Sequence, residues 1–255
     1  WHLSVEGGPL EDRGGALNVE SVLAGVADHF GVTGGAAAGA AQTAVEVEFI
    51  DGVPVALNGE PMPLPQLLAA LNADFRNAPW AWDLVIENRF TGVKSRGLYI
   101  NPAAKLLHMA VDGLARSVFN KPTFDQWVSL GQQYGAILYR GEYFSDQRVI
   151  VETTARAIRR HLTGSVTVQL SPTPYVARVE AKKAVFRKEL ATFEASEFSH
   201  GDAAGFISLS WLSSVGKSFV EDHAHADLVE TATAPASDVC GTQPLPSRGL
   251  VPAPV

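Results

Sequence analysis

Apolar and polar residues alternate in several short segments of the chain, and this period of two predicts strands that are buried on one side. Asp51-Gly52 lies between the first two such segments and predicts a tight hairpin turn. The strands predicted in this way are residues 45–50, 53–57, 166–170 and 175–179, with a further short strand expected at 184–186.

A second pattern, with apolar residues three and four positions apart, predicts amphipathic helices. We expect Pro102 in the first turn of one helix and Thr123 as the N-cap of the next. The predicted helices are 63–76, 102–118, 123–139, 145–162 and 203–222. Because strands occur in clusters between clusters of helices, the sequence predicts an α+β fold, with an antiparallel-rich sheet packed with several helices.

Composition divides the chain into four regions. Residues 1–12 carry a Gly-Gly-Pro turn, and residues 13–44 are so rich in glycine and alanine that we expect a flexible loop. Residues 45–222 hold the predicted helices and strands and form the main domain. Residues 223–255 are rich in alanine, threonine and proline, which predicts a disordered tail.

The totals exclude several classes of protein. Of 255 residues, 46% are hydrophobic, which is enough for a sizeable globular core, and the net charge of −7 argues against binding to nucleic acid. No apolar run reaches the roughly 18–20 residues that a membrane span needs. Cys240 is the only cysteine, so no internal disulfide forms and a reducing compartment is expected.

Motifs for metal, phosphate and nucleophilic chemistry are weak or missing. His223-Ala224-His225 has no further cluster of ligands near it, so we assign no metal site. The glycine-rich stretch 31–41 lacks the lysine of a phosphate-binding loop. No Gly-x-Ser-x-Gly pattern occurs, and we assign no catalytic residue.

The richest polar segment is residues 87–99, ENRFTGVKSRGLY, which follows an apolar run expected to be a buried strand. Glu87 can accept hydrogen bonds from an ammonium group, and Tyr99 is a neutral donor and acceptor. Lys94 and Arg96 can attract anions, while Gly97 permits close approach to the backbone. These features suit a site for an amino acid or a carboxylate, although composition alone leaves open a strand end whose charges are paired locally.

This segment resembles the signature of the argininosuccinate synthases. Four further segments resemble landmarks of that family and occur in the same order along the chain: WHLSVEGGPLED at 1–12, GVPVALNG at 52–59, KELATFE at 188–194 and DAAGFISL at 202–209. Because the chain opens on Trp1 inside the first of these segments, we expect that a preceding portion exists.

The resemblance implies a ligase of arginine biosynthesis that uses ATP to join citrulline and aspartate, forming AMP and pyrophosphate. It implies that Ser4, Glu87 and Tyr99 contact citrulline, with residues 94–97 as a turn between the last two. ATP, with Mg²⁺, would be bound by a nucleotide-binding half that precedes this region in the family. A cytoplasmic homotetramer, in which the helix at 203–222 reaches a neighbouring subunit, is also implied.

The chain departs from the family pattern at two places. Ile100 and Asn101 stand where the family usually has Glu and Thr, and Phe186 stands where it has Tyr. Two alternatives stay open. The absence of an ATP-binding motif suggests a non-catalytic assembly module of the same fold, and Ile100 and Asn101 suggest an ATP-dependent ligase that acts on a different amino acid.

Overall fold

The computed structural model describes residues 2–12, 14, 16–30, 43–170, 173–187, 199 and 201–212. The chain divides into two compact units, Trp1–Lys188 and Glu189–Val255. The first unit contains two antiparallel sheets and their covering helices, and this confirms the predicted α+β fold. No described helix has both the length and the apolar character required to cross a membrane.

The larger sheet has five strands in the order β4-β3-β2-β7-β8, and every neighbouring pair is antiparallel. Asp51 and Gly52, with φ of 50° and 72°, make the tight turn that the sequence predicts between β2 and β3. The predicted period-two strands are confirmed within a residue or two at most ends. The strands are β2 (Ala44–Ile50), β3 (Val53–Leu57), β4 (Glu60–Pro61), β7 (Gly164–Gln169) and β8 (Tyr175–Ala181).

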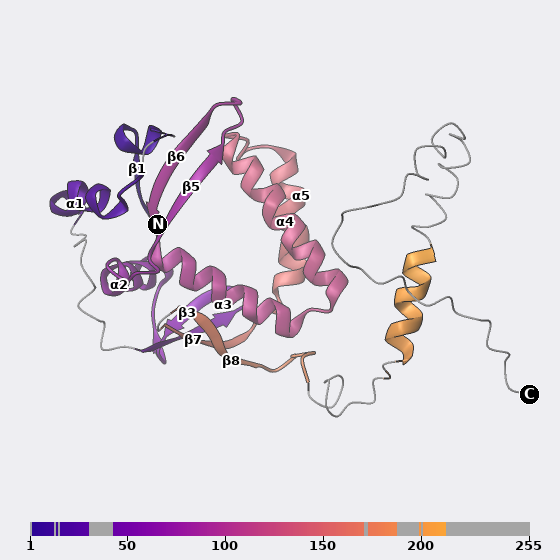
Figure 1. Ribbon diagram of the computed structural model, residues 1–255. Helices are drawn as coiled ribbons and strands as arrows, with labels where there is room; N and C mark the ends of the chain where they lie inside the picture. Colours follow the sequence, from indigo (N-terminus) through magenta and orange to yellow (C-terminus); the bar gives the residue numbers. More distant parts are fainter. Residues whose placement is uncertain are drawn as a thin grey trace, which may run out of the picture. The chain divides into compact units, whose positions relative to one another are not determined.

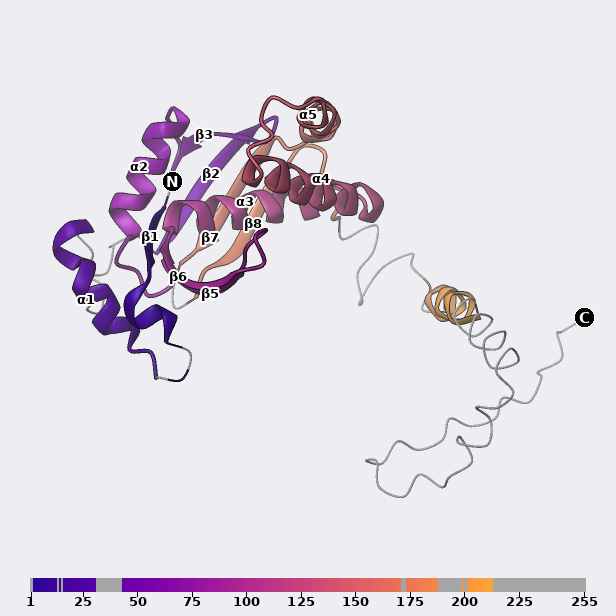
Figure 2. The same ribbon diagram turned by 90° about the horizontal axis from the view of Figure 1, so that it is seen from above.

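Two helices, α2 (Leu64–Phe75) and α3 (Pro102–Val118), pack on the five-stranded sheet and on each other (Figures 1 and 2). Their apolar sides and the inward side chains of β2 and β7 form the main core. Gly113 lets α3 approach β8 closely, since a Cβ at Gly113 would lie 2.9 Å from a methyl carbon of Val176.

The smaller sheet has three strands in the order β1-β6-β5. They are β1 (Leu3–Glu6), β5 (Trp82–Asn88) and β6 (Lys94–Ile100). One face of this sheet is covered by the short 3-10 helix η1 (Gly8–Glu11) and by α1 (Val19–Phe30). The buried residues of this second core are Leu10, Leu23, Leu98 and Ile100.

The remaining helices of the first unit, α4 (Lys121–Tyr139) and α5 (Asp146–Arg159), pack against each other through Leu130, Ile137 and Val151. The tip of the β5–β6 hairpin reaches the end of α4 (Figure 1). There the ring of Phe90 lies 5.0 Å from the ring of Tyr139, measured between centroids.

Some predictions from the sequence were wrong. Residues 19–30 are helical, although 13–44 was expected to be a loop; residues 31–42 lie outside the described residues. The segment 184–186 is not a strand, and the amides of Val185 and Phe186 instead donate to the carbonyl of Ser117 at the end of α3. The described part of the last helix is 201–212, and the expected tail 223–255 also lies outside the described residues.

Candidate functional site

The polar segment 87–99 is a β-hairpin. Strands β5 and β6 pair from Trp82↔Ile100 to Asn88↔Lys94, and the turn lies between them. The amide of Arg89 donates to the carbonyl of Val93 at 3.1 Å, and the amide of Gly92, with φ of 82°, donates to the carbonyl of Arg89 at 2.9 Å. The sequence therefore misplaced the turn, because residues 94–97 lie within β6.

The apolar run before Glu87 was also expected to be buried, and this was wrong. Leu84, Val85 and Ile86 are 39%, 41% and 66% exposed. Their strand, β5, lies at the edge of the small sheet and pairs only with β6 among the described strands. An edge strand lacks a neighbour on one side, so its side chains keep more contact with solvent than those of a central strand.

Register places the three predicted contact residues on one face of the small sheet. Ser4 on β1 lies opposite Tyr99 on β6, and Glu87 on β5 lies opposite Ser95 on β6. Directly opposed residues share a face, and residues two apart in a strand share it as well. Ser4, Glu87 and Tyr99 are therefore gathered on the side of the sheet away from α1 and η1, which we call the polar face.

A hydrogen bond links two of these residues, since the hydroxyl of Tyr99 donates to Oε1 of Glu87. This bond, together with burial and the charge of Glu87, raises the pKa of Tyr99 to about 12. Tyr99 thus stays a neutral phenol, and its hydroxyl proton is used in the hydrogen bond to Glu87. Its oxygen can still accept a hydrogen bond from a ligand N–H.

Gly97 creates the space for this arrangement. A Cβ built on Gly97 would lie 2.7 Å from Cε2, 2.9 Å from the hydroxyl oxygen and 3.0 Å from Cζ of Tyr99. Side-chain atoms do not approach a Cβ so closely, so the Tyr99 ring occupies the place that any side chain at Gly97 would need. The sequence predicted a close approach at Gly97, and the approaching group is the protein's own phenol.

Sequence reasoning missed two further members of the polar face, Arg89 and Ser95, and assigned no role to a third, Glu6. The hydroxyl of Ser95 donates to Oε2 of Glu87 at 3.2 Å. Arg89 donates from Nη2 to Oε2 of Glu6 at 2.7 Å and from Nε to Oγ of Ser95 at 2.9 Å. Glu6 was foreseeable, because it lies two residues after Ser4. The role of Arg89 depends on the true position of the turn, which the sequence did not reveal.

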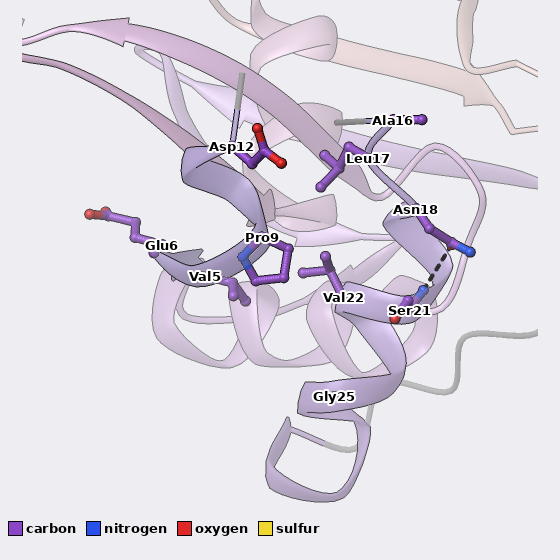
Figure 3. Close-up of a pocket in the computed structure, with 12 residues that line it drawn as sticks. Val5, Glu6, Pro9, Asp12, Ala16, Leu17, Asn18, Ser21, Val22 and Gly25 are labelled. Atoms are coloured by element: carbon purple, nitrogen blue, oxygen red, sulfur yellow. Dashed lines mark hydrogen bonds between the residues drawn. The ribbon is translucent and has the colours of Figure 1, made fainter. Parts of the chain in front are cut away.

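A shallow pocket of about 520 Å³ lies beside this region, at the end of β1 (Figure 3). Pro9, Leu17 and Val22 give it an apolar floor, while Asn18 holds the start of α1 by accepting from the amide of Ser21 at 3.0 Å. In Figure 3 the side chain of Glu6 points away from the other lining residues. The pocket therefore belongs to the apolar side of the sheet, and Glu6 to the polar face.

Two of the residues that depart from the family pattern, Ile100 and Phe186, are not part of the polar face. Ile100 is 3% exposed and packs in the core with Leu10 and Leu98, on the opposite side of the sheet from Tyr99. Phe186 is 77% exposed in the segment after β8. Among the described residues, no three His, Cys, Asp or Glu side chains gather closely enough to hold a metal ion.

Comparison with known proteins identifies the family. Residues 1–216 match the family described as "Arginosuccinate synthase C-terminal domain". The chain is 34% identical over 217 residues to the argininosuccinate synthase of Chlorobaculum parvum, a match that covers 82% of this chain and 51% of the relative. It is 32% identical over 224 residues to that of Clostridium kluyveri, covering 87% of this chain and 54% of the relative. The chain spans about half the length of these curated relatives, and it belongs to the argininosuccinate synthase family as the C-terminal domain.

Proposed function

We propose that this chain is the citrulline-binding half of an enzyme that joins citrulline and aspartate at the expense of ATP, releasing AMP and pyrophosphate. The observation that carries the proposal is the gathering of Ser4, Glu87 and Tyr99 on one face, with Tyr99 bonded to Glu87. These are the three residues that the family signature implies as citrulline contacts, and their convergence on one face supports a shared ligand.

Each side chain has a chemical role in this proposal. The carboxylate of Glu87 accepts hydrogen bonds from the ammonium group of citrulline, and the Tyr99 oxygen accepts one from an N–H of the ligand. The hydroxyl of Ser4 can donate to a ligand oxygen. No protein nucleophile is needed, because ATP activates the ureido oxygen as an adenylate and the amine of aspartate displaces AMP. The contribution of this half is to position citrulline.

ATP and Mg²⁺ would be bound by the nucleotide-binding half of the enzyme, and aspartate would enter with it. The described residues offer neither a phosphate-binding loop nor a carboxylate cluster suited to these ligands. A cytoplasmic location fits a chain with one cysteine, which requires no oxidising compartment.

We also propose assembly into a homotetramer through the helix at 201–212. Its large apolar side chains are between 61% and 73% exposed: Phe206, Ile207, Leu209, Trp211 and Leu212. Apolar surface of this extent favours burial against another chain. Light scattering after size exclusion should give a tetramer for the wild type and smaller species for Leu209→Glu; an unchanged mass would contradict the assignment.

The alternative of a different amino-acid substrate rests on Ile100 and Asn101. Since Ile100 is buried on the apolar side of the sheet, its replacement of the usual residue leaves the contacts on the polar face unchanged. This alternative therefore rests on Asn101, the N-cap of α3.

The test of the function mixes this chain with the separately expressed N-terminal half of a relative such as the Chlorobaculum parvum synthase. We expect citrulline binding by calorimetry, and ATP-dependent release of pyrophosphate only when both halves and both amino acids are present. Folded, associated halves that release no pyrophosphate at saturating substrates would support a non-catalytic module instead.

The test of the site uses Glu87→Gln and Tyr99→Phe. Glu87→Gln removes the negative charge and replaces one acceptor oxygen by an NH2 donor, and Tyr99→Phe removes the hydroxyl. We expect citrulline affinity to fall by about 1–3 kcal/mol per change, with the larger loss for the charged group. Glu48→Gln and Tyr175→Phe are matched controls, because both positions lie on the five-stranded sheet. Unchanged affinity in both site variants would reject the assignment of these residues.

A further inference from the structure

Arg89 connects all three strands of the small sheet. Its Nη2 donates to Glu6 at the end of β1 at 2.7 Å, and its Nε donates to Ser95 on β6 at 2.9 Å. The same Nε lies 3.6 Å from Oε2 of Glu87 on β5. One guanidinium group thus links the strand that carries Ser4 to both strands of the hairpin.

The contacts around Glu87 restrict its orientation. Tyr99 donates to Oε1, Ser95 donates to Oε2, and Arg89 lies beside Oε2. A carboxylate offers about four lone-pair sites, and the Nε–H of Arg89 is donated to Ser95, so the hydroxyls of Tyr99 and Ser95 leave room for about two further donors. Glu87 is therefore held in one orientation with limited capacity for a ligand.

The net charge of the polar face gives a second reason to assign Arg89 a role in the site. Glu6 and Glu87 together carry −2, and Arg89 reduces the charge of the group to −1. The hydrogen bond from Arg89 to Glu6, and the charge of Glu6, raise the pKa of Arg89 above its ordinary value, so the guanidinium stays charged. A residual charge of −1 suits a ligand that presents one ammonium group.

The hairpin tip is fixed on the side away from β1 as well. Phe90, the residue after Arg89, packs against Tyr139 with ring centroids 5.0 Å apart. The guanidinium carbon of Arg140 lies 4.7 Å from the centre of the Phe90 ring. Contacts on both sides of the turn therefore limit where the backbone can place Arg89.

We infer that Arg89 is a positioning residue of the candidate site: by bridging Glu6 and Ser95 beside Glu87, it fixes the carboxylate that receives the ammonium group of the amino-acid ligand. The inference rests on the proposed function for the identity of that ligand. Its structural part, the control of Glu87 by Arg89, does not depend on citrulline and can be measured without it.

Tyr99 provides that measurement. A phenol with a pKa of about 12 is about one-tenth ionised at pH 11, whereas one with the ordinary pKa of about 10 is about nine-tenths ionised. If Arg89 positions Glu87, Arg89→Met loosens the bond from Tyr99 to Glu87, and Tyr99 becomes more than half ionised at pH 11. If Arg89 acted only as a nearby cation, its loss would decrease ionisation instead.

The ionisation of Tyr99 is followed by NMR, from the ring carbon signals of ¹³C-labelled tyrosine in the ligand-free chain. Tyr99→Phe assigns the signal, and circular dichroism confirms that each variant is folded at pH 11. Arg89→Lys should give an intermediate result. Arg96→Met is the matched control, since Arg96 lies on the same hairpin and faces away from Tyr99. Glu6→Gln removes the anchor of Arg89 and also a negative charge that itself raises the pKa of Tyr99, so the inference is tested by Arg89→Met.

Citrulline affinity is measured on the same variants by calorimetry, with both halves of the enzyme mixed. We expect Arg89→Met to bind citrulline at least tenfold more weakly and Arg89→Lys to recover part of the loss. Wild-type or lower ionisation of Tyr99 in Arg89→Met would overturn the inference. Failure of the wild-type halves to bind citrulline would overturn the proposed function alone, because the NMR result is obtained without ligand.

Discussion

The ring of Tyr99 lies directly over Gly97, where an added methyl group would come within 2.7 Å of the ring. Gly97→Ala must therefore move the ring and break its hydrogen bond to Glu87. We expect the free energy of unfolding to fall by about 1–3 kcal/mol, as for other overpacked positions, and citrulline binding to weaken. Urea unfolding and calorimetry measure the two effects.

Gly131→Ala is the matched control for this substitution. Gly131 lies within α4, and nothing lies within 4 Å of a Cβ at that position. Since alanine favours a helix more than glycine does, we expect a gain of about 0.5–1 kcal/mol in stability and no change in citrulline binding. Equal effects of Gly97→Ala and Gly131→Ala would mean that Tyr99 does not occupy the space above Gly97.

Tyr99 also makes stability depend on pH. Its pKa rises from about 10 in the unfolded chain to about 12 in the folded one, so the unfolded chain releases the proton first. The stability that this group contributes is complete below about pH 10 and is lost as pH rises toward 12. Compared with Tyr99→Phe, the wild type should lose stability more steeply between about pH 10 and pH 12. An equal loss of unfolding free energy with pH in the two proteins, measured by urea unfolding, would contradict the raised pKa of Tyr99.

The fold was largely predictable because its strands and helices have clear periods. Residues 45–50 alternate cleanly and form β2, and Asp51-Gly52 predicted the turn after it. The helix α1 was missed because glycine and alanine dominate the surrounding stretch, and those residues favour a loop unless tertiary contacts decide otherwise. In the structure Leu23 supplies such a contact, since it is buried against the small sheet.

The members of the site were less predictable than the fold. The family signature selected Glu87 and Tyr99, but spacing could not show that they bond to each other across two strands. The position of the turn was the missing fact. Once the turn is placed before Lys94, Ser95 comes opposite Glu87, and Arg89 reaches back to Glu6. Contacts between strands depend on register, which local sequence leaves undetermined.

The N-cap of α4 differs from the residue that the sequence predicted, and the difference can be tested. The sequence predicted Thr123 as N-cap, whereas the cap is Asn120, whose side chain accepts from the amide of Thr123 at 3.0 Å. Pro122 is tolerated in the first turn, so the helix begins before it. Asn120→Ala should lower the free energy of unfolding by about 1 kcal/mol, and Thr123→Ala should change it much less. A larger loss of stability for Thr123→Ala than for Asn120→Ala in thermal unfolding would support Thr123 as the N-cap.

Lys105 ties the beginning of α3 to the beginning of β5. Its Nζ donates to the carbonyls of Trp80 and Trp82 at 2.8 and 2.9 Å and lies 2.8 Å from Oδ1 of Asp83, while the lysine side chain is only 28% exposed. Asp83 lies opposite Tyr99, so this contact fixes the other end of the polar face. Lys105→Met leaves three acceptors without their donor, and we expect a loss of about 1.5–3 kcal/mol in stability.

Lys121→Met is the control for Lys105, because Lys121 pairs with Asp125 on α4 through a side chain that is 79% exposed. Exposed pairs four residues apart contribute about 0.5 kcal/mol or less, and that contribution decreases as salt is added. Urea unfolding at low and high salt should therefore give a large, nearly salt-independent loss for Lys105→Met and a small, salt-sensitive one for Lys121→Met. Similar small losses would mean that solvent replaces Lys105 at its three acceptors, and that the polar face is held by the hairpin alone.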